Sequence, residues 1–179
     1  MSIRLSPSKL SVFKDCPRCF YLAENMKVAR PRGIFPSLPG GMDRAFKDWL
    51  DKFRIAGELP PELVGKVRGE LFRDTAKLNR WRNWRTGLEA VVDGVTIIGA
   101  IDDLIQDGTA LSMFDNKTKG SEPKDDGAQY YQHQLDIYGL MFEQNGYKIT
   151  GRGYLNYCWP TEITDNGPGG VSVAFRTKA

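Results

Sequence analysis

The chain has 179 residues, of which 41% are hydrophobic and 26% are charged, a composition typical of one globular domain with its own core. No apolar run approaches the ~18 residues that a membrane span needs, and the N-terminal segment lacks a signal-peptide core, so we expect a cytoplasmic protein that does not bind membranes. The net charge of +3 is only mildly basic, and three cysteines do not form a secreted disulfide framework.

Helices are predicted in the first half of the chain. Ser6 can cap the first of them, with Pro7 at its first position, where a missing N–H costs little. The Pro- and Gly-rich residues 30–41 are expected to form a loop without regular structure. Apolar periodicity predicts helices over residues 6–16 and 42–55 and a weaker helix somewhere within residues 62–79.

Strand patterns begin at residue 88. Two Asp-Gly pairs, Asp93-Gly94 and Asp107-Gly108, are strong hairpin signals between strand-like segments. They predict an antiparallel meander of three strands, over residues 88–92, 95–105 and 110–117. A helix over residues 128–145, ended by Gly146, and strands at 149–158 and 171–176 complete the order. No helix is predicted after the last strand, so we expect a single domain over residues 1–179 that is shortened at its C-terminus.

The second predicted hairpin places three polar side chains on one face of the sheet. A two-residue loop at Asp107-Gly108 pairs Gln106 with Thr109, and counting back along both strands makes Asp102 and Asp115 diagonal neighbours, about 7–8 Å apart at the backbone. Lys117 shares their face because it lies two residues after Asp115. Two carboxylates and a lysine in this arrangement suit Mg²⁺, which prefers oxygen ligands. The alternative for an isolated Asp-x-Lys is a surface ion pair between Asp115 and Lys117.

Four segments in order resemble the PD-(D/E)XK nuclease superfamily, in its RecB-like branch. The G-x-x-D strand and the D-x-K strand of that family are matched by Gly99-Ala100-Ile101-Asp102 and Asp115-Asn116-Lys117. The Q-x-x-x-Y helix motif is matched by Gln134 to Tyr138. The segment LSPSKLSVFKDCPRCFYL is similar to the family's N-terminal S-x-S-x-L-x-x-F-x-x-C-P-R pattern. The branch includes helicase-associated RecB-type and AddB-type nuclease domains and the nucleases of CRISPR spacer acquisition.

The resemblance implies an α/β fold with a restriction-endonuclease-like core, in which a central mixed sheet containing the three-strand meander is flanked by helices. It also implies that Asp102, Asp115 and the backbone carbonyl of Asn116 bind a catalytic Mg²⁺ or Mn²⁺, and that Lys117 is the catalytic lysine. Gln134 and Tyr138 would line the DNA path or brace the site, and their spacing of four places both on one helix face. Tyr138 could also be a core residue, and Gln134 an exposed polar residue.

The family usually supplies a further metal ligand, a histidine, from the helix before the strands. The only histidine here is His133, in the later helix, where a surface or hydrogen-bonding role is expected. The matching segment GGMDRAFKDWLD offers Asp43, whose carboxylate suits a hard cation. Asp43 could equally be a helix N-terminal charge favoured by the helix dipole.

Some relatives also hold a [4Fe–4S] cluster, with one cysteine near the N-terminus and three near the C-terminus. Cys16 matches the first position, but Cys158 stands alone in the C-terminal half, and four thiolates are the usual requirement. We therefore do not expect a cluster in this chain. Cys16 and Cys19 form a C-x-x-C that could be mistaken for a zinc or redox half-site, and simple packing is expected for both.

Basic residues beside aromatic ones suit contact with DNA phosphates and bases. The alternative for such a cluster is a solvated basic face with its tryptophans in the core. The candidates are Arg18 in the basic N-terminal region and Arg80, Arg82 and Arg85, which alternate with Trp81 and Trp84.

Together these observations predict a metal-dependent deoxyribonuclease. The resemblance favours an exonuclease that acts on single strands or DNA ends. The alternative is a nuclease-fold DNA-binding module, or a subunit of a DNA-processing complex with protein partners and little activity alone. DNA binding that ignores divalent metal and survives Asp115→Ala would favour the alternative.

Overall fold

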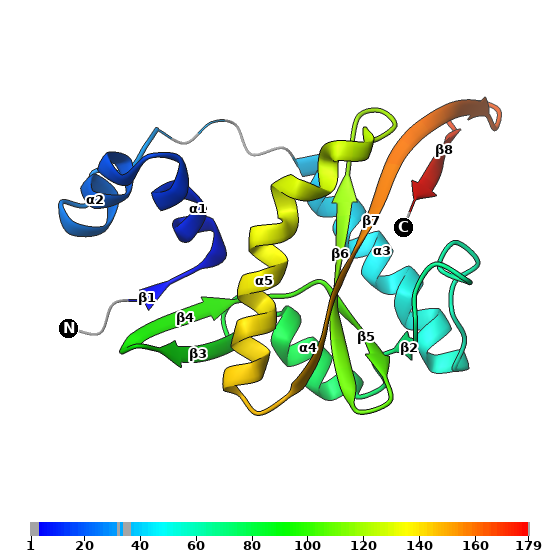
Figure 1. The fold of residues 1–179 in the computed structure, drawn as a ribbon. Helices are drawn as coiled ribbons and strands as arrows, with labels where there is room; N and C mark the ends of the chain where they lie inside the picture. Colours follow the sequence, from blue (N-terminus) through cyan, green and yellow to red (C-terminus); the bar gives the residue numbers. More distant parts are fainter. Residues whose placement is uncertain (1–3, 32, 34–36, 179) are drawn as a thin grey trace.

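The computed structural model describes residues 4–31, 33 and 37–178 (Figure 1). It begins with strand β1 (Arg4–Leu5) and helices α1 (Pro7–Asp15) and α2 (Pro17–Asn25). Ser6 caps α1 as predicted, since its hydroxyl accepts a hydrogen bond from the Lys9 N–H. Among the described helices, none is both long enough and apolar enough to cross a bilayer.

The next helix, α3 (Ser37–Ala56), starts before the predicted residue 42. The expected loop over residues 30–41 is therefore wrong for residues 37–41, while residues 32 and 34–36 lie outside the described residues. Pro39 is tolerated there because N–H groups in a first helical turn have no partner within the helix. The weaker helix expected within residues 62–79 corresponds only to the start of helix α4 (Thr75–Arg82), which Asp74 caps. Strand β2 (Glu70–Leu71) precedes this helix.

The first predicted hairpin is present as β3 (Leu88–Val92) and β4 (Val95–Gly99). Its two-residue loop is Asp93-Gly94, and both residues have positive φ, at 49° and 77°, which the tight turn requires. Strand β1 pairs in parallel with β4 and completes a three-stranded sheet in the order β1-β4-β3.

A second sheet carries most of the remaining chain, in the order β2-β5-β6-β7-β8. Its later strands are β5 (Asp103–Asp107), β6 (Ala110–Thr118), β7 (Lys148–Asp165) and β8 (Val171–Lys178). Strands β6 and β7 are parallel and the other pairs are antiparallel, so the sheet is mixed. A short 3₁₀ turn, η1 (Asp125–Ala128), and helix α5 (Gln129–Gln144) form the crossover from β6 to β7. The expected restriction-endonuclease-like α/β fold, a curled mixed sheet flanked by helices, is confirmed.

One detail of the expected meander differs. Residues 100–102 are not in a strand, so the single strand predicted over residues 95–105 is two strands, β4 and β5, which belong to different sheets. The interruption leaves a short irregular segment between the two hairpins. Asp102 lies in a bend of this segment, immediately before β5.

Helices α3 and α5 cover opposite faces of the second sheet (Figure 1). Side chains alternate along a strand, and Leu104 and Met113 accordingly pack in one core cluster with residues of α5. Ile105 and Phe114 point the other way and pack with Leu50 of α3 in a second cluster. Asp115 and Lys117 follow Met113 at intervals of two, so they belong to the face covered by α5.

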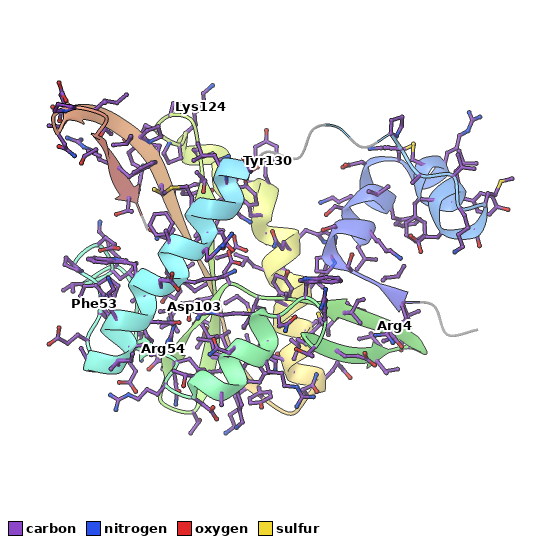
Figure 2. All side chains as sticks on the ribbon, turned by 180° about the vertical axis from the view of Figure 1, so that it is seen from behind. Arg4, Phe53, Arg54, Asp103, Lys124 and Tyr130 are labelled. Atoms are coloured by element: carbon purple, nitrogen blue, oxygen red, sulfur yellow. The ribbon has the colours of Figure 1, made fainter. Side chains whose placement is uncertain are left out.

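Buried ion pairs join α3 and α4 to the start of β5 (Figure 2). Asp103 has no exposed surface and accepts hydrogen bonds from Arg54 at 2.6 and 2.8 Å and from Arg82 at 2.7 Å. Arg54 also donates to the Phe72 carbonyl, and both arginines contact Asp51 at the edge of the network. This network fixes the position of the chain directly after Asp102.

Candidate functional site

The hairpin β5–β6 places Asp115 and Lys117 on one face and brings Asp102, which directly precedes β5, beside them, although its loop differs from the expected one. Asp107 pairs with Ala110, so the loop is Gly108-Thr109 and the ladder is shifted by two positions from the predicted Gln106–Thr109 pairing. A shift by two keeps every side chain on the same face. Extending the observed register places Asp102 opposite Asp115 rather than diagonal to it. The Oδ2 atom of Asp102 accepts a 3.0 Å hydrogen bond from the backbone N–H of Asn116.

Gln134 of α5 connects the buried Asp115 to Lys117. Lys117 Nζ lies 2.5 Å from Asp115 Oδ2 and donates to Gln134 Oε1 at 3.1 Å, while Gln134 Nε2 donates to Asp115 Oδ1 at 3.3 Å. The ammonium group also lies 4.4 Å from the centre of the Tyr131 ring. These contacts hold Lys117 over the sheet, so the ion pair is not the exposed surface pair that was the alternative for the motif. Of the three roles left open for Gln134, namely lining the DNA path, bracing the site or being an exposed polar residue, the contacts favour bracing.

Tyr138 braces the irregular segment that carries Asp102. Its hydroxyl donates a 2.7 Å hydrogen bond to the Ala100 carbonyl, and burial raises the pKa of Tyr138 to about 12, so the donor proton is retained. The ring lies so close to Gly99 that a Cβ there would approach Tyr138 Cε1 to 2.7 Å. This contact gives a physical reason for the glycine of the G-x-x-D pattern. Tyr138 is thus both a core residue and a support of the site.

We expect Tyr138→Phe to weaken Mn²⁺ binding by about 10-fold, as loss of a residue that orients metal ligands typically does. The variant should also lose about 1 kcal/mol of stability, because the Ala100 carbonyl loses its partner. Titration calorimetry and thermal unfolding measure the two effects. Tyr130→Phe, an exposed position on the same helix, is the matched control and should change neither. Unchanged metal affinity in Tyr138→Phe would contradict the bracing role.

Lys47 of α3 is a site residue that the sequence did not indicate. Its Nζ atom lies 2.8 Å from Asp43 and 3.1 Å from Asp102, so it links the two carboxylates. Burial acts to lower the pKa of Lys47, but the carboxylates of Asp102 and Asp43 outweigh it and raise that pKa. Lys47 therefore connects Asp43 to Asp102, and the role of Asp43 as a metal ligand stays a prediction. The only signal in the sequence was the i,i+4 spacing of Asp43 and Lys47.

The carboxylates of Asp102 and Asp115 fit a divalent cation. Asp115 Oδ2 is buried and, apart from the nearby ammonium, has no hydrogen-bond partner of acceptable geometry among the described residues. Burial and, second, repulsion from Asp102 raise the pKa of Asp115 to about 6. A cation would satisfy the unpaired oxygen and relieve the repulsion. No cluster of three or more His, Cys, Asp or Glu side chains gathers within the described ranges, so a cation here would keep several water ligands, as Mg²⁺ does.

Metal binding at this pair should depend on pH. A carboxyl must lose its proton to bind a cation, and Asp115 holds its proton up to about pH 6. We expect the Mn²⁺ affinity to be nearly constant above about pH 7 and to fall by about 10-fold per pH unit below about pH 6. Calorimetric titrations across this range measure it. An affinity that stays constant down to about pH 4.5, where an unperturbed carboxyl begins to titrate, would contradict the assignment of Asp115.

The four candidate DNA-binding arginines have different environments. Arg82 is turned inward, where its side chain is 8% exposed, pairs with Asp103 and Asp51 and donates to the Asp102 carbonyl. Its expected contact with DNA is corrected to a structural role. Arg80 and Arg85 are exposed, and Arg85 lies 5.1 Å from the centre of the exposed Trp84 ring. Arg18 is exposed on α2, which lies apart from the β5–β6 hairpin in Figure 1.

His133 and Cys16 lie outside the contacts described so far. His133 is partly buried on α5, and its Nε2 atom has no hydrogen-bond partner within the described part of the chain. Cys16 caps α2, where its sulfur accepts a 3.4 Å hydrogen bond from the Cys19 N–H. Hydrogen bonds from the Cys19 thiol and N–H, followed by weaker effects of Arg30, lower the pKa of Cys16.

The family model for the PD-(D/E)XK nuclease superfamily matches residues 41–169, which is most of the chain. The matched range includes Lys47, the β5–β6 hairpin and α5, but not α1 and α2. No match was found among curated proteins or among solved structures.

Proposed function

Because the chain belongs to the PD-(D/E)XK nuclease superfamily, we propose that it is a cytoplasmic deoxyribonuclease that depends on Mg²⁺ or Mn²⁺. The observation that carries the proposal is the contact between Asp115, Gln134 and Lys117 on the sheet face beside Asp102. The motifs similar to the RecB-like branch favour an exonuclease that acts on single strands or DNA ends.

Asp102, Asp115 and the Asn116 carbonyl would hold the metal, which when bound lowers the pKa of water and neutralises charge on a phosphoryl oxygen. Lys117 is held by Asp115, Gln134 and the Tyr131 ring in a position to donate to a phosphate oxygen or to orient the attacking water. Gln134 hydrogen-bonds to both Lys117 and Asp115 and so holds these two side chains in a fixed arrangement. Tyr138 keeps Asp102 in place through the Ala100 carbonyl.

Exposed basic residues would hold the DNA backbone around this centre. Arg18, Arg80 and Arg85 are exposed, and the Arg85 guanidinium lies beside the exposed Trp84 ring. Contacts of this kind add affinity for any sequence and make binding depend on salt. Arg82 is not included because its guanidinium group is committed to Asp51 and Asp103.

The test is digestion of single- and double-stranded DNA labelled at the 5′ or the 3′ end, with Mn²⁺ or EDTA. We expect metal-dependent loss of the labelled strand. Lys117→Met should lower the rate by about 100- to 1,000-fold, because a donor placed at developing charge is removed. Lys148→Met, at the exposed start of β7, is the matched control and should retain full activity. No digestion by the wild-type protein, or full activity in Lys117→Met, would refute the proposal.

A second candidate is a nuclease-fold DNA-binding subunit of a DNA-processing complex, with little activity alone. The ammonium of Lys47 between Asp43 and Asp102 favours it, because a fixed cation there can replace a metal in neutralising the carboxylates. A subunit of this kind would bind DNA equally well in EDTA and in Mn²⁺, and its binding would survive Asp115→Ala. Digestion by the isolated protein would exclude it.

A further inference from the structure

A cavity of about 510 Å³ lies between α5, β7 and the segment that joins β6 to α5. Lys124 stands on that segment, close to the curled β7–β8 ribbon in Figure 2. Gln132 and Asp136 line the cavity from α5, and Tyr157 lines it from β7. Tyr157 pairs with Lys117 in the parallel ladder, so paired side chains on this sheet face connect the cavity to the candidate active site.

Tyr157 presents an unpaired polar group at this cavity. Its side chain is 8% exposed, and its hydroxyl is buried with no hydrogen-bond partner among the described residues. A Cβ at Gly127 would lie 3.3 Å from the hydroxyl oxygen, so the small residue leaves room beside it. Buried hydroxyls without a partner are rare, and this one is a donor available to a group that enters the cavity. Burial raises the pKa of Tyr157, so the hydroxyl stays a neutral donor.

A chain of cation and ring contacts links Tyr157 to Lys117. Lys117 Nζ lies 4.4 Å from the centre of the Tyr131 ring, and Lys119 Nζ donates a 3.1 Å hydrogen bond to the Tyr131 hydroxyl. Lys119 Nζ also lies 5.8 Å from the centre of the Tyr157 ring, and the two rings are 6.3 Å apart. Lysines alternating with aromatic rings are the arrangement that binds phosphates and stacks bases in single-stranded nucleic acid.

We propose that this cavity is a subsite for one unpaired nucleotide of the DNA strand, adjacent to the phosphate that Lys117 contacts. The base enters between α5 and β7, and Lys119 and Lys124 contact its flanking phosphates. The volume lies within the about 300–1,000 Å³ range of small-ligand pockets. Asp136 can accept a hydrogen bond from an exocyclic amino group, a contact that carboxylates make with bases. A stacked base pair cannot enter, so the subsite selects single strands.

This inference rests on the proposed nuclease function, but binding can be measured without cleavage. Asp115→Asn serves as the parent because it removes a proposed metal ligand while leaving the cavity intact. Its affinity for a single-stranded oligonucleotide containing 2-aminopurine is measured by anisotropy in EDTA, and insertion of the base is measured by quenching of the 2-aminopurine fluorescence. Thermal unfolding is recorded for every variant.

On this parent, Tyr157→Phe should weaken single-strand binding by about 2- to 10-fold, the worth of one hydrogen bond. It should leave duplex binding and the unfolding temperature unchanged, because no described residue hydrogen-bonds to the hydroxyl. Lys124→Glu should weaken single-strand binding and reduce the quenching. Lys148→Glu, which changes the net charge equally at an exposed position at the start of β7, should do neither.

The subsite is refuted if Tyr157→Phe binds and quenches like its parent, or if Lys124→Glu and Lys148→Glu have the same effect. A clear fall in the unfolding temperature of Tyr157→Phe also refutes it, since the hydroxyl would then have a structural partner. Failure of the proposed function has a separate signature, namely that the protein with Asp115 intact degrades no DNA with Mn²⁺. Digestion of DNA without any effect of Tyr157→Phe would leave the nuclease standing and remove only the subsite.

Discussion

Asp115→Asn should lower the rate of DNA digestion by at least about 100-fold. Loss of a residue that only orients a metal ligand lowers activity by up to about 100-fold, and this substitution removes the proposed ligand itself. The same substitution should stabilise the metal-free protein. Ionised Asp115 is buried beside Asp102, and its pKa is raised to about 6 from the ordinary value of 3.8. Keeping it ionised at pH 8 therefore costs up to about 3 kcal/mol of folding free energy.

The sign of the stability effect depends on pH. A pKa that is raised in the folded state means that the folded protein binds the proton more tightly, so the wild-type protein loses stability as the pH rises through about 6. The gain from Asp115→Asn should be largest above this pH and should shrink toward pH 4. Denaturant unfolding in EDTA at both ends of the range measures it. Asp48→Asn, at an exposed position on α3, is the control and should change little. Destabilisation by Asp115→Asn at pH 8 would contradict this account of the carboxylate pair.

Asp103→Ala should cost about 3–5 kcal/mol of unfolding free energy, the largest effect on stability that we expect in this chain. The substitution leaves the Arg54 guanidinium, whose side chain is 1% exposed, as a buried charge without its main partner. Arg82 loses the same partner, and the α3–α4 packing behind Asp102 is weakened with it. Denaturant unfolding of the metal-free protein measures the loss.

Asp51 provides a matched control for this network. It contacts the same two arginines, but its side chain is 32% exposed, so water can replace its contacts. Asp51→Ala should therefore cost only about 1 kcal/mol. Equal losses in the two variants, or a larger loss for Asp51→Ala, would show that burial of Asp103 is not what makes the network important.

The sequence predicted the side-chain face of the hairpin more reliably than its register. Asp-Gly signalled a tight turn, and Asp115 and Lys117 share one face of β6 as predicted, even though the loop is Gly108-Thr109. Asp102 lies in a bend before β5, so the strand alternation does not decide its direction. An error of two residues is harmless because side chains alternate with a period of two. The interruption at residues 100–102 was not predictable, because it depends on Tyr138, which contacts Ala100 and Gly99 from a distant helix.

The residues that the sequence could not place are those whose partners lie far along the chain. Lys47 contacts Asp102, and Arg54 contacts Asp103, through packing of α3 on the sheet, which no local pattern records. Arg82 and Arg85 are close neighbours in one basic cluster, yet the first is buried in ion pairs and the second lies over an exposed ring. Their difference arises because α4 ends at Arg82, with that side chain facing the network. The composition of residues 80–85 predicts a basic cluster, but it does not predict which of its arginines is buried.

Anomalous diffraction from a crystal soaked in Mn²⁺ tests the proposed metal site most directly. We expect a single strong peak contacted by the carboxylates of Asp102 and Asp115 and by the Asn116 carbonyl. The peak should disappear in Asp115→Asn crystals soaked in the same way. A peak that persists in that variant, or that lies away from the β5–β6 hairpin, would contradict the assignment of Asp102 and Asp115 as the metal ligands.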